Sequence, residues 1–290
     1  MLSSAMTLQY LERLQIHRPK RPTTAALFAL HRAHVEKVPY ETLEIQLGRP
    51  TSIDPDESVD RILGGRGGYC YHLNGAFAAL LSTVGYRVAW HLAGVQVGAE
   101  SAAGANCNHL ALTVECEGQT WFADVGLADA LYTPLPLSEG MYSQGCMTFG
   151  LRLSEAKPGG WRFDHDSKGS FLGMDFQAEP ASPADFVEQH QYLSTSPKSP
   201  FANTAFVFRR DFHGVDALRG CVLTRIDRDG RRKHELTTGE EWFAVLRSRF
   251  GLTLSDLSAS ERQGLWHRVH EAHVARESTM THASYTAAAD

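Results

Sequence analysis

The feature that most constrains this chain is a run of glycines followed at once by a cysteine and a helical pattern. Residues 64–68 contain four glycines with Arg66 between them, and Cys70 comes two positions later. Glycine tolerates positive φ and lets other groups approach the backbone closely. After Cys70, apolar residues recur at three- and four-residue spacing up to Gly85, which indicates a buried helix with a left-handed stop. We therefore expect Cys70 in the first turn of a buried helix, at the end of a tight glycine loop.

The first turn of a helix is a suitable place for a reactive thiol. Its N–H groups have no partner within the helix, and the helix dipole adds positive charge, so both effects favour the thiolate over the thiol. Most free cysteines are nevertheless small buried hydrophobic residues. Cys70 is therefore a candidate nucleophile whose role depends on whether the chain supplies a base and an orienting acid.

Composition and charge exclude several classes of protein. At 290 residues the chain can form two or three domain-sized units, and its net charge of −5 includes no long basic or acidic block. Neither nucleic acid nor a membrane is therefore expected as a partner. Residues 1–6 lack the regions of a signal peptide, and the scattered cysteines, without a Cys-x-x-Cys motif, indicate reduced thiols. We expect a cytoplasmic protein, as a monomer or homodimer.

The first third of the chain is predicted to be helical and the middle third extended. Apolar spacing and capping residues favour helices over residues 7–14, 25–36, 55–63 and 70–84. From residue 132 to 187, short β-like runs alternate with glycine and proline, as in an antiparallel barrel or sandwich. The remaining predictions are a helix opening at 183, a polar loop over 194–201, a strand over 205–210, a hairpin turning at Asp229-Gly230, and helices over 240–250 and 258–275. The small, polar residues 278–290 are expected to be a disordered tail.

A hairpin in the middle of the chain places a histidine and a carboxylate on one face. His109 opens a segment that alternates with period two, Glu117-Gly118 is a turn signal, and a second strand follows to Val125. With these two turn residues, directly opposite residues have numbers that add to an odd total. His109 and Asp124 meet this parity condition, so they share a face on a diagonal, within reach of each other. Each residue alone would also suit a structural role at a strand end.

Five motifs spread along the chain resemble those of the arylamine N-acetyltransferase family, in the family's order. They are the opening helix at 10–14; His34 with Val38-Pro39-Tyr40-Glu41; Arg66-Gly67-Gly68-Tyr69-Cys70 with Asn74; His109 followed by Asp124-Val125-Gly126; and the run 192–201. The resemblance extends over most of the chain.

The resemblance implies an α+β multidomain fold. Its parts are an N-terminal helical bundle, an antiparallel β-barrel and a C-terminal α/β lid, arranged around a Cys–His–Asp core of the papain and transglutaminase type. Carried onto this chain, the helical domain with the nucleophile spans residues 1–88 and the barrel domain with the histidine and aspartate spans 89–203. The lid spans 204–277, and 278–290 is the tail.

The resemblance also implies an activity. Cys70, His109 and Asp124 correspond to the family's catalytic triad, in agreement with the hairpin parity. The family moves an acetyl group from acetyl-coenzyme A to an arylamine, arylhydrazine or arylhydroxylamine, through an acetyl-cysteine and with ping-pong kinetics. Acetyl-coenzyme A is therefore the expected co-substrate, and no metal is expected.

Further positions carry over from the family. They are Gly126, Leu127, Ala128, Thr195 and Ser196 for coenzyme A; Tyr40, Leu127 and Phe201 for the acceptor; and Arg66 with Glu41 as an ion pair that supports the glycine loop. The chain departs from the family at His72, where glutamate or glutamine is usual, and at Thr42, where asparagine is usual. Leu127-Ala128 replaces Phe-Gly, and this change predicts an unusual acceptor pocket.

The sequence leaves three alternatives. The triad could form an amide that releases or cyclises a polyketide-type natural product, as some members of the family do. It could instead pass an acyl group to water, as papain-like hydrolases do. Finally, Cys70, His72, Cys107 and His109 could bind zinc in a binding module, although each pair is closer in sequence than structural zinc ligands usually are.

Overall fold

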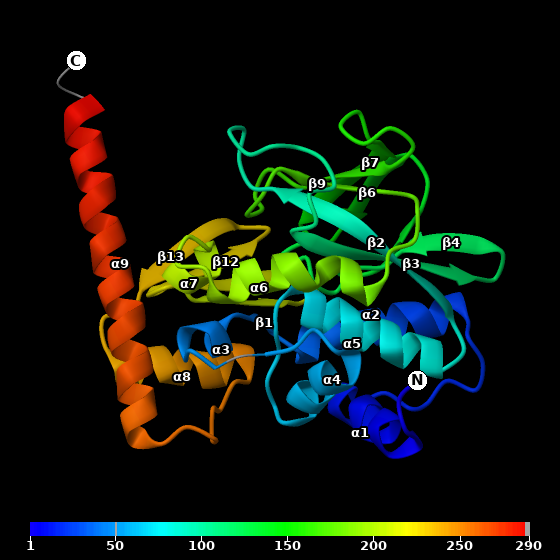
Figure 1. The fold of residues 1–290 in the computed structure, drawn as a ribbon, viewed down its shortest axis with the longest axis horizontal. Helices are drawn as coiled ribbons and strands as arrows, with labels where there is room; N and C mark the ends of the chain where they lie inside the picture. The colour runs from blue at the N-terminus through cyan, green and yellow to red at the C-terminus, as the bar shows by residue number, and fades with distance from the viewer. Residues whose placement is uncertain (50, 288–290) are drawn as a thin grey trace.

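The computed structural model describes residues 1–49 and 51–287, with side chains up to Ser278. Figure 1 shows helices from the first third of the chain at one end, a barrel-like antiparallel sheet above them, and a second sheet beside the last two helices. This arrangement confirms the predicted α+β fold of helical bundle, antiparallel barrel and α/β lid. None of the helices in the described part of the chain has both the length and the apolar character needed to cross a membrane.

The helical end of the molecule is built around one buried helix. Its longer helices follow capping residues: Ser3, Thr23 and Asp54 each accept a hydrogen bond from a backbone N–H two or three residues further on. In the central helix, α5, every residue from Cys70 to Ala78 is buried, so this helix forms the core of the bundle. The helices are α1 (Ser4–Leu14), α2 (Thr24–Lys37), α3 (Leu43–Gln46), α4 (Pro55–Leu63) and α5 (Cys70–Thr83).

The middle of the chain forms an eight-stranded antiparallel sheet in the order β5-β4-β3-β2-β9-β8-β7-β6. Its strands are β2 (Arg87–Gln96), β3 (His109–Cys116), β4 (Gln119–Phe122), β5 (Leu135–Pro136), β6 (Gly140–Gln144), β7 (Met147–Leu153), β8 (Trp161–Asp164) and β9 (Gly173–Phe176). A helical segment follows it, with η1 (Pro183–Phe186), α6 (Val187–Thr195) and α7 (Pro200–Asn203).

The hairpin of β3 and β4 has the predicted register. Glu117 and Gly118 form its turn with φ of 51° and 78°, and Cys116 pairs with Gln119. Residues 110, 112, 114, 121 and 123, which were predicted to share an apolar face, pack together against the helical core. The opposite face is thereby left to the residues of the site.

The second sheet joins the last third of the chain to the first. β1 (Tyr40–Glu41) pairs with β10, with Tyr40 opposite Phe208, and the sheet order is β1-β10-β11-β12-β13. The remaining elements are β10 (Phe206–Arg210), β11 (Gly214–Arg219), β12 (Val222–Asp227), β13 (Gly230–Glu235), α8 (Gly239–Phe250) and α9 (Ala259–Ala287). The pairing of β1 with β10 brings the segment before the glycine loop next to the lid.

Most predicted boundaries shift by a few residues, and two predictions for the last third of the chain differ in ways that have a clear physical reason. Asp227 pairs with Gly230, so the last hairpin turns at Arg228-Asp229, one residue earlier than predicted, and Gly230 at φ 108° opens the returning strand. The last helix continues to Ala287, so the disordered tail predicted from residue 278 does not hold for 278–287. No glycine or proline follows Gly264 in the sequence to end the helix. Residues 288–290 lie outside the described part.

Three hydrophobic cores hold the described residues together. The first unites the helices with one face of β2, β3 and β4, the second fills the barrel, and the third lies between the second sheet and α8 and α9. The first core crosses the predicted domain limit at residue 88, because Leu110 and Leu112 pack with Phe77. The predicted domain limits at residues 88 and 203 remain predictions. The hydrophobic packing of the described residues is continuous.

Candidate active site

Cys70 is the first residue of α5, as the sequence predicts. The first N–H groups of the helix have no partner within it, and they lie at the positive end of the helix dipole. The cysteine is only 3% exposed, and its Sγ lies 3.8 Å from the backbone carbonyl of Asn108. The structure thus places the thiol in a buried position at the start of a helix, next to the segment that enters β3.

His109 and Asp124 form the hydrogen bond that the hairpin parity predicts. The His109 ring donates through Nε2 to Asp124 Oδ2 at 2.8 Å, and both residues are buried. The other carboxylate oxygen, Oδ1, accepts from the N–H of Gly126 at 2.9 Å and from the amide of Asn74 at 2.8 Å. Asp124 is therefore held on both sides, and the imidazole orientation follows from it.

The His109 ring also contacts Cys70, which completes a chain of three groups. Because Nε2 is bound to Asp124, Nδ1 is the ring nitrogen left for the thiol. Burial of the ring disfavours its charged form, but the charges of Asp124 and Cys70 outweigh burial and raise the pKa of His109 from 6.5 to about 10. The structure thus brings together all three residues predicted for catalysis, with a strongly basic imidazole between the sulfur and the carboxylate.

The raised pKa of His109 predicts where the reaction of Cys70 loses activity at high pH. A proton held with a pKa of about 10 stays on the ring across the neutral range, so it is lost only on the alkaline side. We expect the rate of Cys70 acylation in single-turnover experiments to fall above about pH 10, when the ring no longer protonates the leaving thiolate. An alkaline limit near pH 6.5, the ordinary pKa of histidine, would contradict the described coupling.

Asn74 is a residue of the site for which the sequence predicted no role. Its Nδ2 donates to Asp124 Oδ1 and to the Leu110 carbonyl at 2.6 Å, and its Oδ1 accepts from the N–H of Val125 at 2.9 Å. It lies four residues after Cys70, on the same face of α5. This i, i+4 relation is the sequence signal that could have identified it.

Gly126 lies against the nucleophile. A Cβ at this position would be 2.8 Å from the Cα of Cys70 and 2.9 Å from Nδ2 of Asn74, closer than real Cβ contacts. The absence of a side chain at residue 126 therefore lets the turn after Asp124 close onto the start of α5. This packing gives Gly126, predicted as a coenzyme contact, a second reason to be glycine.

Gly126→Ala is therefore expected to displace the nucleophile. We predict that Cys70 acylation slows about 10- to 100-fold, because displacements well below 1 Å already misalign reacting groups. Thermal unfolding should show a loss of about 1–3 kcal/mol from overpacking. Gly264→Ala is the matched control, because a Cβ there meets only ordinary contact distance, 3.6 Å from Arg268. Equal acylation rates in the two variants would contradict the prediction.

The glycine loop is held by the predicted ion pair. Arg66 Nη2 lies 3.3 Å from Glu41 Oε1, and the same carboxylate accepts from the N–H of Gly67 and, at 2.7 Å, from that of Leu43. Burial alone would raise the pKa of Glu41, but the charge of Arg66 and these N–H donors lower it. A Cβ on Gly67 would lie 1.9 Å from the Pro39 carbonyl, so the loop packs directly on the segment before β1.

The three departures from the family pattern each have a structural outcome. His72 takes the third position of α5, and its Nδ1 accepts from the Tyr69 N–H at 3.3 Å, as a glutamate would in a capping box. Thr42 accepts from the Phe206 N–H at 3.0 Å and so ties the loop to the lid. Ala128 adopts φ 46°, a left-handed conformation that favours glycine.

A cavity of about 230 Å³ opens at Cys70 and His109. Five of the residues predicted to bind coenzyme A or acceptor line it: Tyr40, Gly126, Leu127, Ala128 and Phe201. Wall residues that were not predicted include Val95, Val97, Asn108, Ser170, Phe171, Phe206, Phe208 and Arg219. They come from the barrel and from the lid, so no local sequence pattern marks them.

The structure does not bring the other two predicted coenzyme contacts into this cavity. Thr195 lies in a separate hollow of about 930 Å³ beside α3 and α9, and its hydroxyl donates to the Gln191 carbonyl within α6. Ser196 accepts from the Lys198 N–H in a local turn. Both residues end α6, which turns them away from the face that reaches Cys70.

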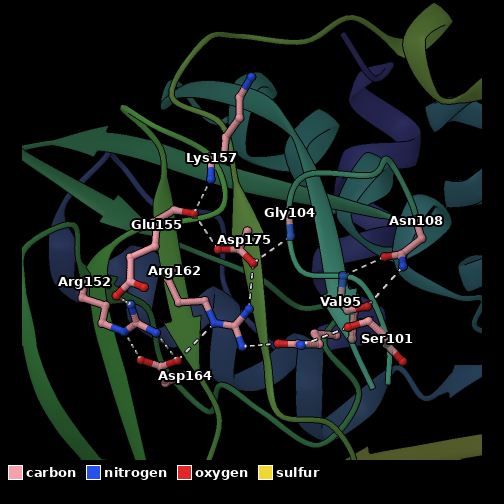
Figure 2. A network of polar contacts seen from close by, with 12 residues as sticks. Val95, Ser101, Gly104, Asn108, Arg152, Glu155, Lys157, Arg162, Asp164 and Asp175 are labelled. Atoms are coloured by element: carbon pink, nitrogen blue, oxygen red, sulfur yellow. Dashed lines mark hydrogen bonds and ion pairs between the residues drawn. The ribbon is translucent and has the colours of Figure 1, made fainter. Parts of the chain in front are cut away.

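A buried polar network holds the loop that carries Asn108 (Figure 2). Asp175 accepts from Arg162 at 2.7 Å, from Ser154 at 2.6 Å and from the N–H of Gly104 at 3.0 Å. Figure 2 also shows the side-chain amide of Asn108 joined to the backbone of Val95 in both directions. These bonds attach the loop between β2 and β3 to the barrel at its ends and at Gly104, beside one wall of the cavity.

The residues of the zinc alternative do not converge. Cys107 donates to the Asp185 carbonyl at 3.2 Å, and His72 is bound to Tyr69 as described. Within residues 1–49 and 51–278, no group of three or more histidine, cysteine or acidic side chains is placed to hold a metal ion. Cys70 and His109 face each other and Asp124 instead.

Comparison with known proteins agrees with this geometry. The sequence pattern of a family described as N-acetyltransferase matches residues 23–259, most of the chain. The chain belongs to the arylamine N-acetyltransferase family. The protein is thus an acyltransferase, and the fold implied by the five motifs is that of its own family.

The relatives of this chain include proteins with different names. An arylamine N-acetyltransferase of Mycolicibacterium smegmatis is 28% identical over 270 residues, covering 88% of this chain and 94% of that protein. The structure of the Mycobacterium abscessus arylamine N-acetyltransferase superposes with a TM-score of 0.81 at 28% identity, covering 93% of this chain and 99% of that one. A proansamycin X synthase of Amycolatopsis mediterranei is 32% identical over 155 residues, covering 52% of this chain and 58% of that protein.

Proposed function

We propose that this protein transfers the acetyl group of acetyl-coenzyme A to arylamines or arylhydrazines through an acetyl-cysteine at Cys70. The observation that carries the proposal is the chain of Cys70, His109 and Asp124 at one end of a largely apolar cavity. Such a chain activates a sulfur nucleophile, and the cavity gives two substrates in turn access to the same sulfur.

In the first half-reaction His109 holds the proton of the Cys70 thiol, and the sulfur attacks the thioester carbonyl. Negative charge then develops on the carbonyl oxygen beside the first turn of α5, whose free N–H groups are suited to stabilise it. When the intermediate collapses, the bond to the coenzyme sulfur breaks and His109 returns the proton to it. One thioester replaces another, so the acetyl group stays on Cys70 without a large change in free energy.

In the second half-reaction the amine takes the place of the coenzyme. An aromatic amine is weakly basic, so its lone pair is free at neutral pH and attacks the acetyl carbonyl on Cys70. His109 accepts a proton from the attacking nitrogen and returns it to the departing sulfur. Tyr40, Phe201 and Phe208 form aromatic walls of the cavity that suit a flat ring.

The main alternative is amide formation on a polyketide-type product. The similarity to a proansamycin X synthase favours it, because that protein is named for such a product. The aromatic walls of the cavity at Cys70 favour a flat aromatic acceptor instead. Acetyl-coenzyme A consumption with a simple arylhydrazine would decide for the small acceptor.

Intact-protein mass spectrometry tests the proposed function directly. After incubation with acetyl-coenzyme A alone, we expect a gain of one acetyl group on the peptide that contains Cys70. Addition of an arylamine should remove the acetyl group and produce the acetylated amine. Loss of the group at the same rate without amine would instead show a hydrolase, and no acetylation at all would contradict the proposal.

We also propose that the protein works in the cytoplasm. All five cysteines are free in the structure, including Cys70. The proposed mechanism requires a reduced thiol at that position, which a reducing compartment maintains.

A further inference from the structure

One wall of the cavity pairs an aromatic ring with a cation. Phe206 on β10 and Arg219 on β11 are directly opposite each other in the second sheet, and both line the cavity that contains Cys70. The Arg219 guanidinium lies over the Phe206 ring, 5.2 Å from its centre. The sheet register and this stacking hold a positive charge at a defined place on the cavity wall.

Apart from its stacking on Phe206, the Arg219 guanidinium has no partner among the residues whose side chains the structure describes. It makes no hydrogen bond or ion pair with residues 1–49 and 51–278, and the side chain remains exposed. Its neighbours Arg231 and Arg276 are bound, to the Lys168 carbonyl and to the Thr204 hydroxyl respectively. The guanidinium of Arg219 therefore keeps its donors for a group that enters the cavity.

The surroundings of Arg219 favour an anion. Although the Arg219 side chain reaches solvent, partial desolvation by the surrounding protein lowers its pKa. Asp129 opposes this shift, and the charges of Arg276 and Arg231 lower the pKa further, so positive potential accumulates here. Asp129 is itself buried and bound to Ser170 at 2.9 Å. A bound anion would add the partner that this part of the wall lacks.

We propose that Arg219 binds an acidic substituent on the aromatic ring of the acceptor, so that the enzyme prefers arylamines that carry a carboxylate. This inference rests on the proposed function. The aromatic walls formed by Tyr40, Phe201 and Phe206 receive the ring, Cys70 faces the amine, and the planar guanidinium matches a carboxylate with two parallel hydrogen bonds. Arg219 is then a specificity-determining residue of the lid.

The phosphates of coenzyme A are the other anions that could meet Arg219, and the two half-reactions separate the two cases. In a ping-pong mechanism the kcat/KM for acetyl-coenzyme A reports only the first half-reaction, and the kcat/KM for the amine reports only the second. An acceptor contact therefore changes only the second constant. The aromatic stacking partner of Arg219 favours the acceptor, because a ring bound beside Phe206 brings its substituent to the guanidinium.

The test compares 4-aminobenzoate with 4-aminobenzamide, a neutral molecule of almost the same shape. In Arg219→Gln we expect the kcat/KM for 4-aminobenzoate to fall about 10- to 100-fold, as for the loss of a charge-assisted hydrogen bond, and that for the amide to change less than about 3-fold. Arg219→Lys should recover part of the loss, since it keeps the charge without the fork. Arg232→Gln is the control, because it removes a charge from the same sheet at a residue paired with Asp227, outside the cavity.

Each other outcome has a defined meaning. An equal fall for both amines would show a general packing role for Arg219 and overturn the inference. A lower rate of Cys70 acetylation by acetyl-coenzyme A would assign Arg219 to the coenzyme and overturn it as well. Wild-type protein that transfers acetyl equally well to both amines, with no effect of Arg219→Gln, would overturn the inference but leave the proposed function standing. Wild-type protein that never acetylates Cys70 would instead refute the proposed function.

Discussion

Replacing Cys70 with serine is expected to lower acetyl transfer by at least about 10³-fold, because the alkoxide of serine is far harder to form beside His109 than the thiolate. The geometry around residue 70 should survive, since the side chain is buried in the first turn of α5 and the exchange keeps its size. Intact mass after incubation with acetyl-coenzyme A and steady-state turnover with an arylamine measure the two consequences. The acetyl group should be absent from the variant.

Cys107 provides the matched control for this substitution. It lies on the loop beside the site, with its thiol donating to the Asp185 carbonyl, and burial raises the pKa of the Cys107 thiol to about 11. Cys107→Ser should therefore retain turnover within about 3-fold, because such a thiol is unreactive at neutral pH. Full activity in Cys70→Ser, or an acetyl group found on Cys107, would refute the assignment of the nucleophile.

Asp124→Asn is expected to slow Cys70 acetylation by about 10³- to 10⁴-fold, the scale seen when the orienting carboxylate of a triad becomes an amide. The substitution removes the negative charge that raises the pKa of His109. Its amide oxygen is expected at the Oδ1 position, where it accepts from Gly126 and Asn74, so that its NH₂ group faces Nε2 of His109. The alkaline limit of the reaction should therefore move down from about pH 10. Single-turnover rates across the pH range measure both effects.

The control for Asp124→Asn is the same exchange on the lid. Asp227 pairs with Arg232 and Arg225 at the surface of the second sheet, away from the cavity. Asp227→Asn should leave both the rate and the alkaline limit unchanged. An Asp124→Asn variant with the wild-type pH profile would mean that the imidazole does not depend on this carboxylate.

The features of this fold that could be predicted from the sequence are those that depend on neighbouring residues. Asp54 caps α4, Cys70 opens α5, and the Glu117-Gly118 turn sets the register of β3 and β4, because each depends on neighbours only a few residues away. The meeting of His109 and Asp124 follows from that register alone. Cys70 was joined to them by the family resemblance, and its contact with His109 became visible only in the tertiary structure.

The predictions that differ from the structure also concern particular segments. Thr195 lies near the acceptor loop in sequence, yet α6 turns it into a different hollow from Phe201. The long final helix, α9, runs through residues predicted to be a tail, although nothing in the local sequence beyond Gly264 ends a helix. The position of Thr195 depends on how α6 lies in the fold, whereas the length of α9 agrees with a local sequence that lacks helix-breaking residues.

By itself, the sequence determined the nucleophile's position at a helix start and the pairing of histidine with aspartate, and its resemblance to a known family implied the three-part fold. Only the tertiary structure decided what surrounds them: the Asn108 loop held by Asp175, the aromatic walls, and the free charge of Arg219. Spacing along the chain encodes contacts within a helix or a hairpin. The cavity is instead formed where a helix, a barrel and a second sheet meet, and that meeting depends on long-range packing of their buried faces.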